Sequence, residues 1–339
     1  MKPVVLSAPL PRSLELIFTP ENLDVLNNVY KVVETTDEAL SQLPVERLYA
    51  ARYIIGQPPL SQETLLNLRS LRAVLNVESN LLDNMPYPTL FERGIHVLTT
   101  GSVFAMPVAE LGVGLALDLA RGITESDFAF RQGNERWGGE GNAKARLINN
   151  SDVGIIGYGD LGRALSKTLS GFNCDIKAYD PWLPPSVLRE NGVIPATLNE
   201  VITSSDFLFV VAAVTSENRH FLGAEAFAAM RPGTRFILLS RADVVDFDAL
   251  MDAAESGQLC VASDVFPEEP VPENHRVRTL PNIIRSSHRA GALDVAFKQM
   301  GSMVLEDMEL MDKGLPPVRC KRAERETVSR MQSKPVTHN

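Results

Sequence analysis

A glycine-rich turn near the middle of the chain has a spacing that suits phosphate binding. Gly157, Gly159 and Gly162 fit the pattern GxGxxG, with an apolar, strand-like run before them and a helical pattern after them. In such a turn the first glycine permits the sharp bend, the second lets the backbone approach a pyrophosphate, and the third lets the helix pack on the strand. The N–H groups at the start of the helix would then face the phosphates.

An acidic residue follows this turn at the distance that a bound ribose requires. Asp180 comes after the second strand-like run, 18 residues beyond Gly162. A carboxylate there accepts hydrogen bonds from the ribose hydroxyls and would repel a 2′-phosphate. Because no arginine follows Asp180 directly, the sequence predicts NAD rather than NADP. A purely structural turn with a chance acid is the alternative.

Polar residues follow three later apolar runs, at the places where ligands bind in open α/β sheets. Arg241 follows the first run, Asp264 and Glu269 the second, and His288 the third. Each residue taken alone has an ordinary explanation. The arginine can be a solvated charge, the glutamate before Pro270 can be a loop acid, and a single histidine is more often structural than catalytic.

Together, and in this order after the glycine turn, these segments resemble the D-isomer-specific 2-hydroxyacid dehydrogenases. Members of that family include phosphoglycerate, glyoxylate/hydroxypyruvate and D-lactate enzymes. The resemblance covers roughly residues 71–301. Further matching segments are Val108-Ala-Glu110, Thr215 with Asn218, and Met230-Arg-Pro-Gly233.

The resemblance implies a role for each polar residue in transferring a hydride between NAD(H) and a 2-hydroxy acid/2-oxo acid pair. Arg241 would bind the substrate carboxylate and polarise the carbonyl oxygen, since a guanidinium is a fixed fork of donors. His288 would be the general acid in reduction and the general base in oxidation. Glu269 would orient the imidazole and favour its protonated form. Direct hydride transfer needs no metal.

The resemblance also implies which residues hold the cofactor. The backbone from Gly159 through Asp160 to Leu161 would hold the pyrophosphate, in addition to Gly157, Gly162 and Asp180. Thr215 would contact NAD, and Asp264 would accept a hydrogen bond from the nicotinamide carboxamide.

The domain organisation is likewise implied by the family. A Rossmann cofactor domain with a doubly wound parallel sheet, residues 102–290, would be inserted into a smaller flavodoxin-like α/β substrate domain, residues 1–101 and 291–339. The active site would lie in the cleft between them, with closure excluding water. Members are usually homodimers joined through the cofactor domain, and the helix predicted over Pro107–Ala120 would take part.

The predicted substrate loop departs from the family pattern. Members commonly carry a glycine-containing turn whose N–H groups receive the substrate carboxylate, whereas this chain has Glu78, Ser79 and Asn80 there. An acid near that position repels a carboxylate unless it points away or is paired. We therefore expect these three residues to recognise a group beyond a minimal 2-oxo acid. Arg52, near the end of an early strand, is a further possible anion contact.

The elements that must position these residues follow from periodicity. Short apolar runs alternate with helical patterns, which predicts parallel α/β sheets. Thr19 and Pro20 predict a helix start, and Thr197-Leu-Asn-Glu200 has the spacing of a capping box. The methionine-rich stretch Leu293–Met311 predicts a core helix. Trp137 is expected to be a packing anchor, and the tail Pro316–Asn339 to be at least partly mobile.

Composition limits the class of protein. The chain has 339 residues, a formal net charge of −9, 45% hydrophobic and 22% charged residues, as in an ordinary globular protein of about two domains. The acidic balance argues against a general nucleic-acid binder. Three cysteines without metal spacing indicate reduced thiols. No clean signal peptide or membrane span is visible, so we expect a soluble cytoplasmic protein.

Two other functions stay open. One is an NAD(H)-sensing binding protein on the same fold with vestigial dehydrogenase activity, for which the altered substrate loop leaves room. The other is formate or phosphite oxidation on the same scaffold. The sequence does not identify the 2-hydroxy acid or the physiological direction.

Overall fold

The computed structural model describes residues 2–78 and 81–330, which form two compact α/β units. The first unit comprises the chain up to Phe104, the segment Thr215–Glu217 and the chain from Ala292 onward. The second comprises Ala105–Val214 and Asn218–Gly291. The second unit is therefore inserted into the first. Within this insertion, the short segment Thr215–Glu217 is grouped with the first unit.

The first unit is built on a six-stranded sheet whose first five strands are parallel. From one edge the order is β2-β1-β3-β4-β5, which is the flavodoxin order, and β13 completes it antiparallel to β5. Its strands are β1 (Val4–Ala8), β2 (Lys31–Glu34), β3 (Ala51–Gly56), β4 (Ala73–Asn76), β5 (His96–Thr99) and β13 (Lys321–Arg322).

Helices cover both faces of this sheet because its buried strands are apolar on both sides. Tyr53 and Ile55 of β3 pack into one hydrophobic cluster, and Ile54 between them packs into the other. The helices of this unit are α1 (Leu14–Ile17), α2 (Pro20–Val29), α3 (Asp37–Leu40), α4 (Val45–Ala50), α5 (Gln62–Asn67), α6 (Tyr87–Glu92), α15 (Asp294–Asp312) and α16 (Arg325–Val328). The predicted start of α2 is confirmed: Thr19 accepts a hydrogen bond from the Asn22 N–H.

The C-terminal segment contributes the buried residues Cys320 and Ala323 to the core of the first unit, and the expectation of an at least partly mobile tail stays a prediction. The methionines of α15 are buried, as predicted. The carboxylate of Asp307, fully buried on this helix, accepts hydrogen bonds from the backbone N–H groups of Val318, Arg319 and Cys320. It thereby holds the chain that continues into β13. Residues 331–339 of the tail lie outside the described residues.

The second unit is built on a seven-stranded, fully parallel sheet in the order β8-β7-β6-β9-β10-β11-β12. This is the doubly wound dinucleotide-binding order with one further strand, as predicted. Its strands are β6 (Asp152–Ile156), β7 (Asp175–Tyr179), β8 (Ile194–Pro195), β9 (Phe207–Val210), β10 (Thr234–Leu238), β11 (Leu259–Ser263) and β12 (Ile283–Arg285).

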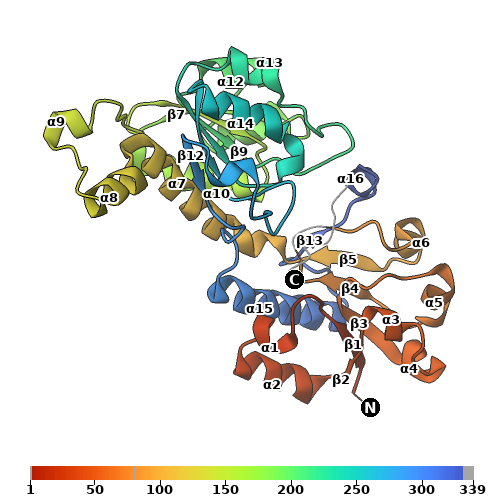
Figure 1. The fold of residues 1–339 in the computed structure, drawn as a ribbon. Helices are drawn as coiled ribbons and strands as arrows, with labels where there is room; N and C mark the ends of the chain where they lie inside the picture. The colour runs from red at the N-terminus through yellow and green to blue at the C-terminus, as the bar shows by residue number, and fades with distance from the viewer. Residues whose placement is uncertain (1, 79–80, 331–339) are drawn as a thin grey trace. The chain divides into compact units, whose positions relative to one another are not determined.

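Helices lie on both sides of this sheet (Figure 1). The predicted capping box at Thr197 and Glu200 is present and starts α12. The helices of this unit are α7 (Ala105–Arg121), α8 (Ile123–Arg131), α9 (Gly138–Gly141), α10 (Asp160–Leu169), α11 (Pro185–Glu190), α12 (Leu198–Ser204), α13 (Ala224–Ala229) and α14 (Phe247–Glu255).

The small residues of α7 permit close packing against its neighbours. A Cβ on Gly112 would lie 2.5 Å from Leu239 Cδ1. With the preceding 3₁₀ turn, Gly101–Arg121 is the one helix among the described residues that is long and apolar enough to cross a membrane, and half of it is buried. The sequence predicts no such span, because polar residues interrupt the stretch before Glu110 and because Glu110 and Asp118 bound the apolar run Leu111–Leu117.

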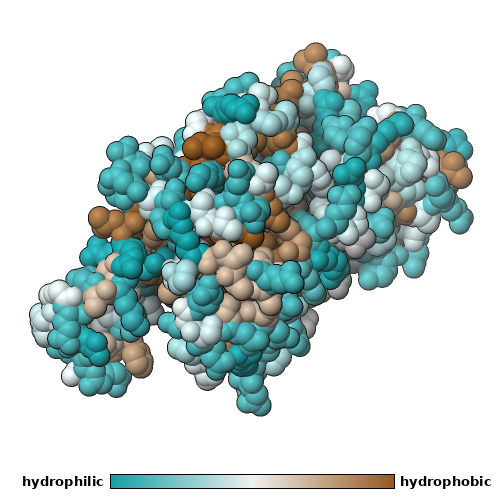
Figure 2. Space-filling view, turned by 90° about the horizontal axis from the view of Figure 1, so that it is seen from above, coloured by the Kyte–Doolittle hydropathy of each residue, from teal (hydrophilic) through white to brown (hydrophobic). Residues whose placement is uncertain are grey.

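The segment after α7 forms an arm, α8 and α9, that extends away from the sheet of the second unit (Figure 1). No residue of α8 is buried. Trp137, just before α9, is 74% exposed, so the expectation of a packing anchor is wrong within this chain. In the space-filling view, apolar patches interrupt a mostly hydrophilic surface (Figure 2).

Candidate active site

The polar residues singled out in the second unit gather at the carboxyl edge of its sheet. The strands are parallel, so the loops after their carboxyl ends share one edge. Gly157 follows β6, Asp180 follows β7, Arg241 follows β10, Asp264 follows β11 and His288 follows β12. The sequence prediction of their common location therefore agrees with the strand order.

The glycine turn is shaped to take a group from outside the chain. A Cβ on Gly157, whose φ is +92°, would meet the backbone of Ala212 at 2.6 Å, and one on Gly162 would meet the Gly157 carbonyl oxygen at 2.4 Å. A Cβ on Gly159 would meet nothing within 4 Å. Gly159 is the N-cap of α10 and provides no side-chain cap for the helix N–H groups. The turn thus leaves an open cradle at a helix N-terminus, which fits a pyrophosphate.

Asp160 and Leu161 form the first turn of α10, next to this cradle. Asp180 braces the glycine turn from the neighbouring strand, because its two carboxylate oxygens accept hydrogen bonds from Tyr158 N (2.7 Å) and Trp182 N (2.9 Å). Each carboxylate oxygen has a second lone pair. Asp180 can therefore hold the turn and still accept from a ribose hydroxyl.

His288 and Glu269 form a direct pair. The distance from His288 Nδ1 to Glu269 Oε2 is 2.5 Å, and the other oxygen, Oε1, accepts from Phe266 N at 2.8 Å. Burial opposes the charge on Glu269. The hydrogen bonds from His288 and Phe266, with the nearby positive charges of His288 and Arg241, outweigh burial and lower the pKa of Glu269 below its ordinary value. Glu269 therefore stays an anion that fixes the ring and leaves Nε2 for other partners.

Asp264 holds the loop that carries His288. Its side chain is 1% exposed, and its oxygens accept from Arg289 N at 3.1 Å and Ala290 N at 3.0 Å, while its carbonyl oxygen accepts from His288 N at 2.8 Å. These three bonds stabilise a backbone in which His288 has a φ of +49°, an uncommon value for histidine. The sequence analysis missed this positioning role, and the predicted contact of Asp264 with nicotinamide stays a prediction.

Arg241 completes the group. It lies close enough to Glu269 for its charge to help lower the pKa of that carboxyl, and its Nη1 donates to the Ser240 carbonyl oxygen at 2.8 Å. The second unit therefore brings together the guanidinium of Arg241, the carboxylate of Glu269 and the imidazole of His288. This set can bind a carboxylate and exchange a proton beside it.

The predicted substrate loop follows β4 in the first unit. Ser79 and Asn80 lie outside the described residues. Glu78 is paired, not free: its Oε1 is 3.0 Å from Arg12 Nε, and both side chains are nearly buried. The repulsion expected from an unpaired acid is thus offset. Arg12, which follows β1, is a residue that the sequence analysis missed, although its place after the first strand was a usable signal.

A network of buried amides supports this loop from below. Asn76, the last residue of β4, donates to Gln57 Oε1 at 2.5 Å, and Gln57 Nε2 donates to the Leu82 carbonyl oxygen at 2.9 Å. Tyr87 donates to the same carbonyl at 2.7 Å. Both ends of the loop are therefore fixed on the first unit's sheet.

Two other predicted contacts have different surroundings. Thr215 is buried in the segment that belongs with the first unit, and its hydroxyl accepts from Glu217 N. Its contact with NAD stays a prediction. Arg52 lies at the start of β3, away from the carboxyl edge, and pairs with Asp312 at 3.0 Å, so the suggestion of an anion contact is wrong. Across the described chain, no group of three or more His, Cys, Asp or Glu could hold a metal.

Comparison with known families decides the classification. The model of the family described as "D-isomer specific 2-hydroxyacid dehydrogenase, NAD binding domain" matches residues 113–290, just over half of the chain. The chain belongs to the D-isomer-specific 2-hydroxyacid dehydrogenase family. The matched residues contain the glycine cradle, Asp180 and the Arg241–Glu269–His288 group, and the cofactor of this dehydrogenase is NAD.

Curated relatives carry several names. D-3-phosphoglycerate dehydrogenase of Methanocaldococcus jannaschii is 30% identical over 69% of this chain, which spans only 44% of that protein. Glyoxylate reductase of Thermococcus litoralis is 30% identical over 69% of this chain and 72% of its own length. Hydroxypyruvate reductase of Thermotoga maritima is 30% identical over 66% of this chain and 72% of its own length.

A solved structure is much more similar. It is described as a phosphoglycerate oxidoreductase from Rhizobium etli, with 64% identity, a TM-score of 0.89, and coverage of 96% of this chain and 99% of the other. The D-mandelate dehydrogenase of Rhodotorula graminis, at 21% identity and a TM-score of 0.80, shares the fold. The NAD-dependent dehydrogenase class is thus established, whereas the relatives differ in the substrate that their names give.

Proposed function

We propose that this dehydrogenase works as a 2-oxo acid reductase, in which Arg241 binds the substrate carboxylate and His288 supplies the proton. The observation that carries the proposal is the 2.5 Å pair of His288 and Glu269 beside Arg241, on the same sheet edge as the glycine cradle. A vestigial sensor has no need for an imidazole fixed by an anion.

The chain's own residues perform binding and proton transfer. When NADH is bound in the cradle, it supplies the hydride to substrate C2. Arg241 offers its planar fork to the carboxylate and polarises the adjacent carbonyl. Glu269 holds Nδ1 of His288, so that Nε2 carries the proton given to the carbonyl oxygen. In the reverse reaction, Nε2 takes the proton from the hydroxyl.

The inserted second unit is the cofactor unit in this proposal, and the first unit binds the substrate through its loop after β4. Support for the second role is the buried amide network under that loop. Free cysteines at positions 174, 260 and 320 are consistent with our proposal that the enzyme works in the reducing cytoplasm.

The decisive experiment follows NADH oxidation with glyoxylate, hydroxypyruvate, pyruvate, phosphohydroxypyruvate and bulkier 2-oxo acids, for the wild type and His288→Ala. We expect turnover that falls at least about 100-fold in the variant, the low end of a general acid's contribution. NADH binding should persist, because His288 lies outside the glycine cradle. Binding of NADH without turnover of any substrate in the wild type would favour the NAD(H)-sensing alternative.

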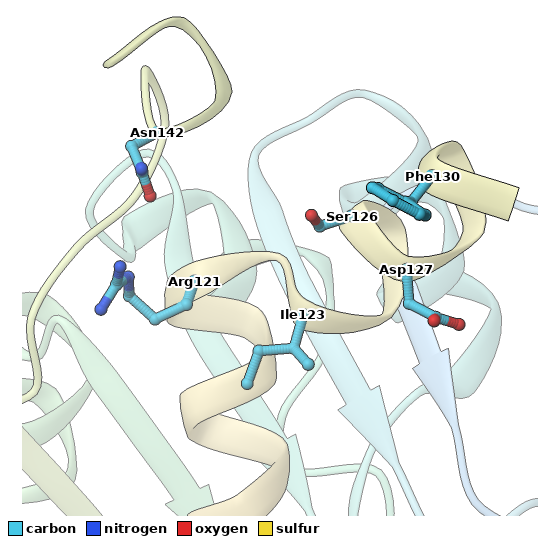
Figure 3. A pocket seen from close by; sticks show the side chains of 6 residues that line it. All are labelled: Arg121, Ile123, Ser126, Asp127, Phe130 and Asn142. Atoms are coloured by element: carbon cyan, nitrogen blue, oxygen red, sulfur yellow. The ribbon is translucent and has the colours of Figure 1, made fainter. Parts of the chain in front are cut away.

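We also propose that the enzyme is a homodimer joined through the arm of the second unit. Support comes from the apolar side chains that the arm leaves uncovered: Phe128 is 66% and Phe130 62% exposed. A nine-residue helix that buries nothing is not stable by itself. A groove at the base of the arm is lined by Arg121, Ile123, Ser126, Asp127, Phe130 and Asn142 (Figure 3).

The oligomeric state tests this proposal. Phe128→Asp with Phe130→Asp should convert a dimer into a monomer in light scattering, because each charge would be buried in the apolar contact. Glu190→Gln, at the end of α11 on the same unit, serves as the control. A wild-type monomer, or a variant that stays dimeric, would contradict this use of the arm.

A further inference from the structure

The glycine turn of the second unit carries a single charged side chain, and that side chain is acidic. In the pattern from Gly157 to Gly162, the residue after Gly159 is Asp160, and the first cationic residue beyond the pattern is Arg163. Asp160 is the first residue of α10, whose N-cap Gly159 provides no side-chain cap. A carboxylate therefore stands at the helix end that fits a pyrophosphate.

The helix itself gains from this acid. The first N–H groups of a helix carry partial positive charge, so a carboxylate in the first turn is stabilising. Each Cα–Cβ bond of a helix is tilted toward the N-terminus of that helix. The side chain of Asp160, which is partly buried, therefore starts out in the direction of the cradle.

A bound pyrophosphate reverses the effect of this charge. The open space beside Gly159, where a Cβ would meet nothing within 4 Å, is the space that the phosphates would take, so Asp160 lies next to them in the chain. Asp180 can accept a hydrogen bond from a ribose hydroxyl, as it does from Tyr158 N and Trp182 N. An ionised phosphate has no hydrogen to donate, so between it and the Asp160 carboxylate only repulsion remains.

We propose that the Asp160 carboxylate weakens the hold of the cradle on NAD(H), so that used cofactor leaves quickly and fresh cofactor replaces it. The N–H groups of the turn bind the pyrophosphate, and Asp160 limits how tightly they do so. Because product release limits kcat in many enzymes, rapid release of the cofactor favours turnover. The inference needs only the cofactor of this family and does not depend on which substrate the enzyme takes.

The test is Asp160→Asn, which keeps the size of the side chain and removes its charge. At about 0.01 M ionic strength, where charges act over about 30 Å, the variant should bind NADH about 3- to 10-fold more tightly in a fluorescence titration. Displacement of NADH by excess ADP-ribose in stopped flow should slow by a similar factor. At about 1 M ionic strength, where the screening length is about 3 Å, the gain in affinity should nearly vanish.

Glu225→Gln is the matched control. Glu225 also lies in the first turn of a helix of the second unit, α13, whose N-cap Gly223 likewise provides no side-chain cap. Both variants should slightly lower the midpoint of thermal denaturation, because each removes a charge that favours a helix N-terminus. Only Asp160→Asn should tighten the binding of NADH. Asp160→Ser removes the same charge with a different side chain and serves as the test if Asp160→Asn fails to fold.

Two competing ligands separate charge repulsion from a change of shape. ADP-ribose keeps the pyrophosphate, whereas adenosine has no phosphate, so Asp160→Asn should gain affinity for the first and not for the second. NADH binding that is unchanged or weaker in the uncharged variants at low ionic strength would overturn the proposal. An equal gain for adenosine, or a gain that persists at high ionic strength, would also overturn it. These binding measurements need no substrate, so a failure of the proposed reductase function would appear separately, in the turnover assays.

Discussion

The substitution Gly159→Ala should separate cofactor binding from folding in the glycine cradle. A Cβ at this position meets no heavy atom within 4 Å, and the φ of −72° suits alanine. The folded chain should lose about 1 kcal/mol or less, the cost of a poorer helix N-cap. The methyl group would instead project into the space that the pyrophosphate needs. Steric intrusion of that kind costs about 1–3 kcal/mol, which corresponds to a roughly 5- to 150-fold weaker affinity for NADH.

Gly162→Ala is the matched comparison, because there the clash is within the chain. The new Cβ would lie 2.4 Å from the Gly157 carbonyl oxygen, and a backbone atom cannot move aside as a side chain can. This variant should lose about 1–3 kcal/mol of stability, seen as a lower midpoint of thermal denaturation. Fluorescence titration with NADH and thermal denaturation of both variants give the comparison. A Gly159→Ala protein that binds NADH like the wild type would refute the placement of the pyrophosphate.

Three further variants test the residues around the cradle and the acid–base pair. Asp264→Asn should destabilise the protein by about 1.5–3 kcal/mol, since an amide nitrogen would oppose a backbone N–H. It should also lower kcat with little change in the Kd for NADH. A weaker Kd with unchanged kcat would instead favour the nicotinamide contact. Glu269→Gln should lower kcat about 100-fold. Because the pKa of Glu269 is lowered from its ordinary value of 4.5, its negative charge stabilises the fold above that pH. The difference in stability between the wild type and the variant should therefore shrink as the pH falls below about 4.5. A difference in denaturation midpoints that stays constant with pH would contradict this. Asp180→Ser should weaken NADH binding more than NADPH binding in parallel titrations, and an equal loss would argue against a ribose contact.

The parts of the site that depend on local pattern were predictable from the sequence. The turn from Gly157 to Gly162 needs particular backbone conformations and close approaches, which only glycine permits, so residue type reveals it. The position of Asp180 follows from the length of one strand–helix–strand unit. The location of Arg241 and His288 on one edge follows from the parallel direction of the strands.

Features that depend on tertiary partners were not predictable. Arg12 and Glu78 are far apart in the chain, and no local pattern links them. The positioning role of Asp264 arises from its contact with a loop 25 residues away. Trp137 was expected to be a packing anchor, but it lies in the arm of α8 and α9, where its side chain is exposed to solvent. The tail is polar in sequence, yet the buried carboxylate of Asp307 fixes its backbone as far as Cys320.

The discontinuous first unit has a consequence for how the chain matures on the ribosome. One of its hydrophobic clusters includes Ala296, Met300 and Met308 from α15, and its sheet ends with β13, so residues 1–100 emerge with one sheet face only partly covered. The inserted unit is almost continuous in sequence and can reach its native contacts earlier, although domains generally fold from the N-terminus onward. The N-terminal strands therefore stay exposed to chaperones and to premature association until α15 and β13 have been translated.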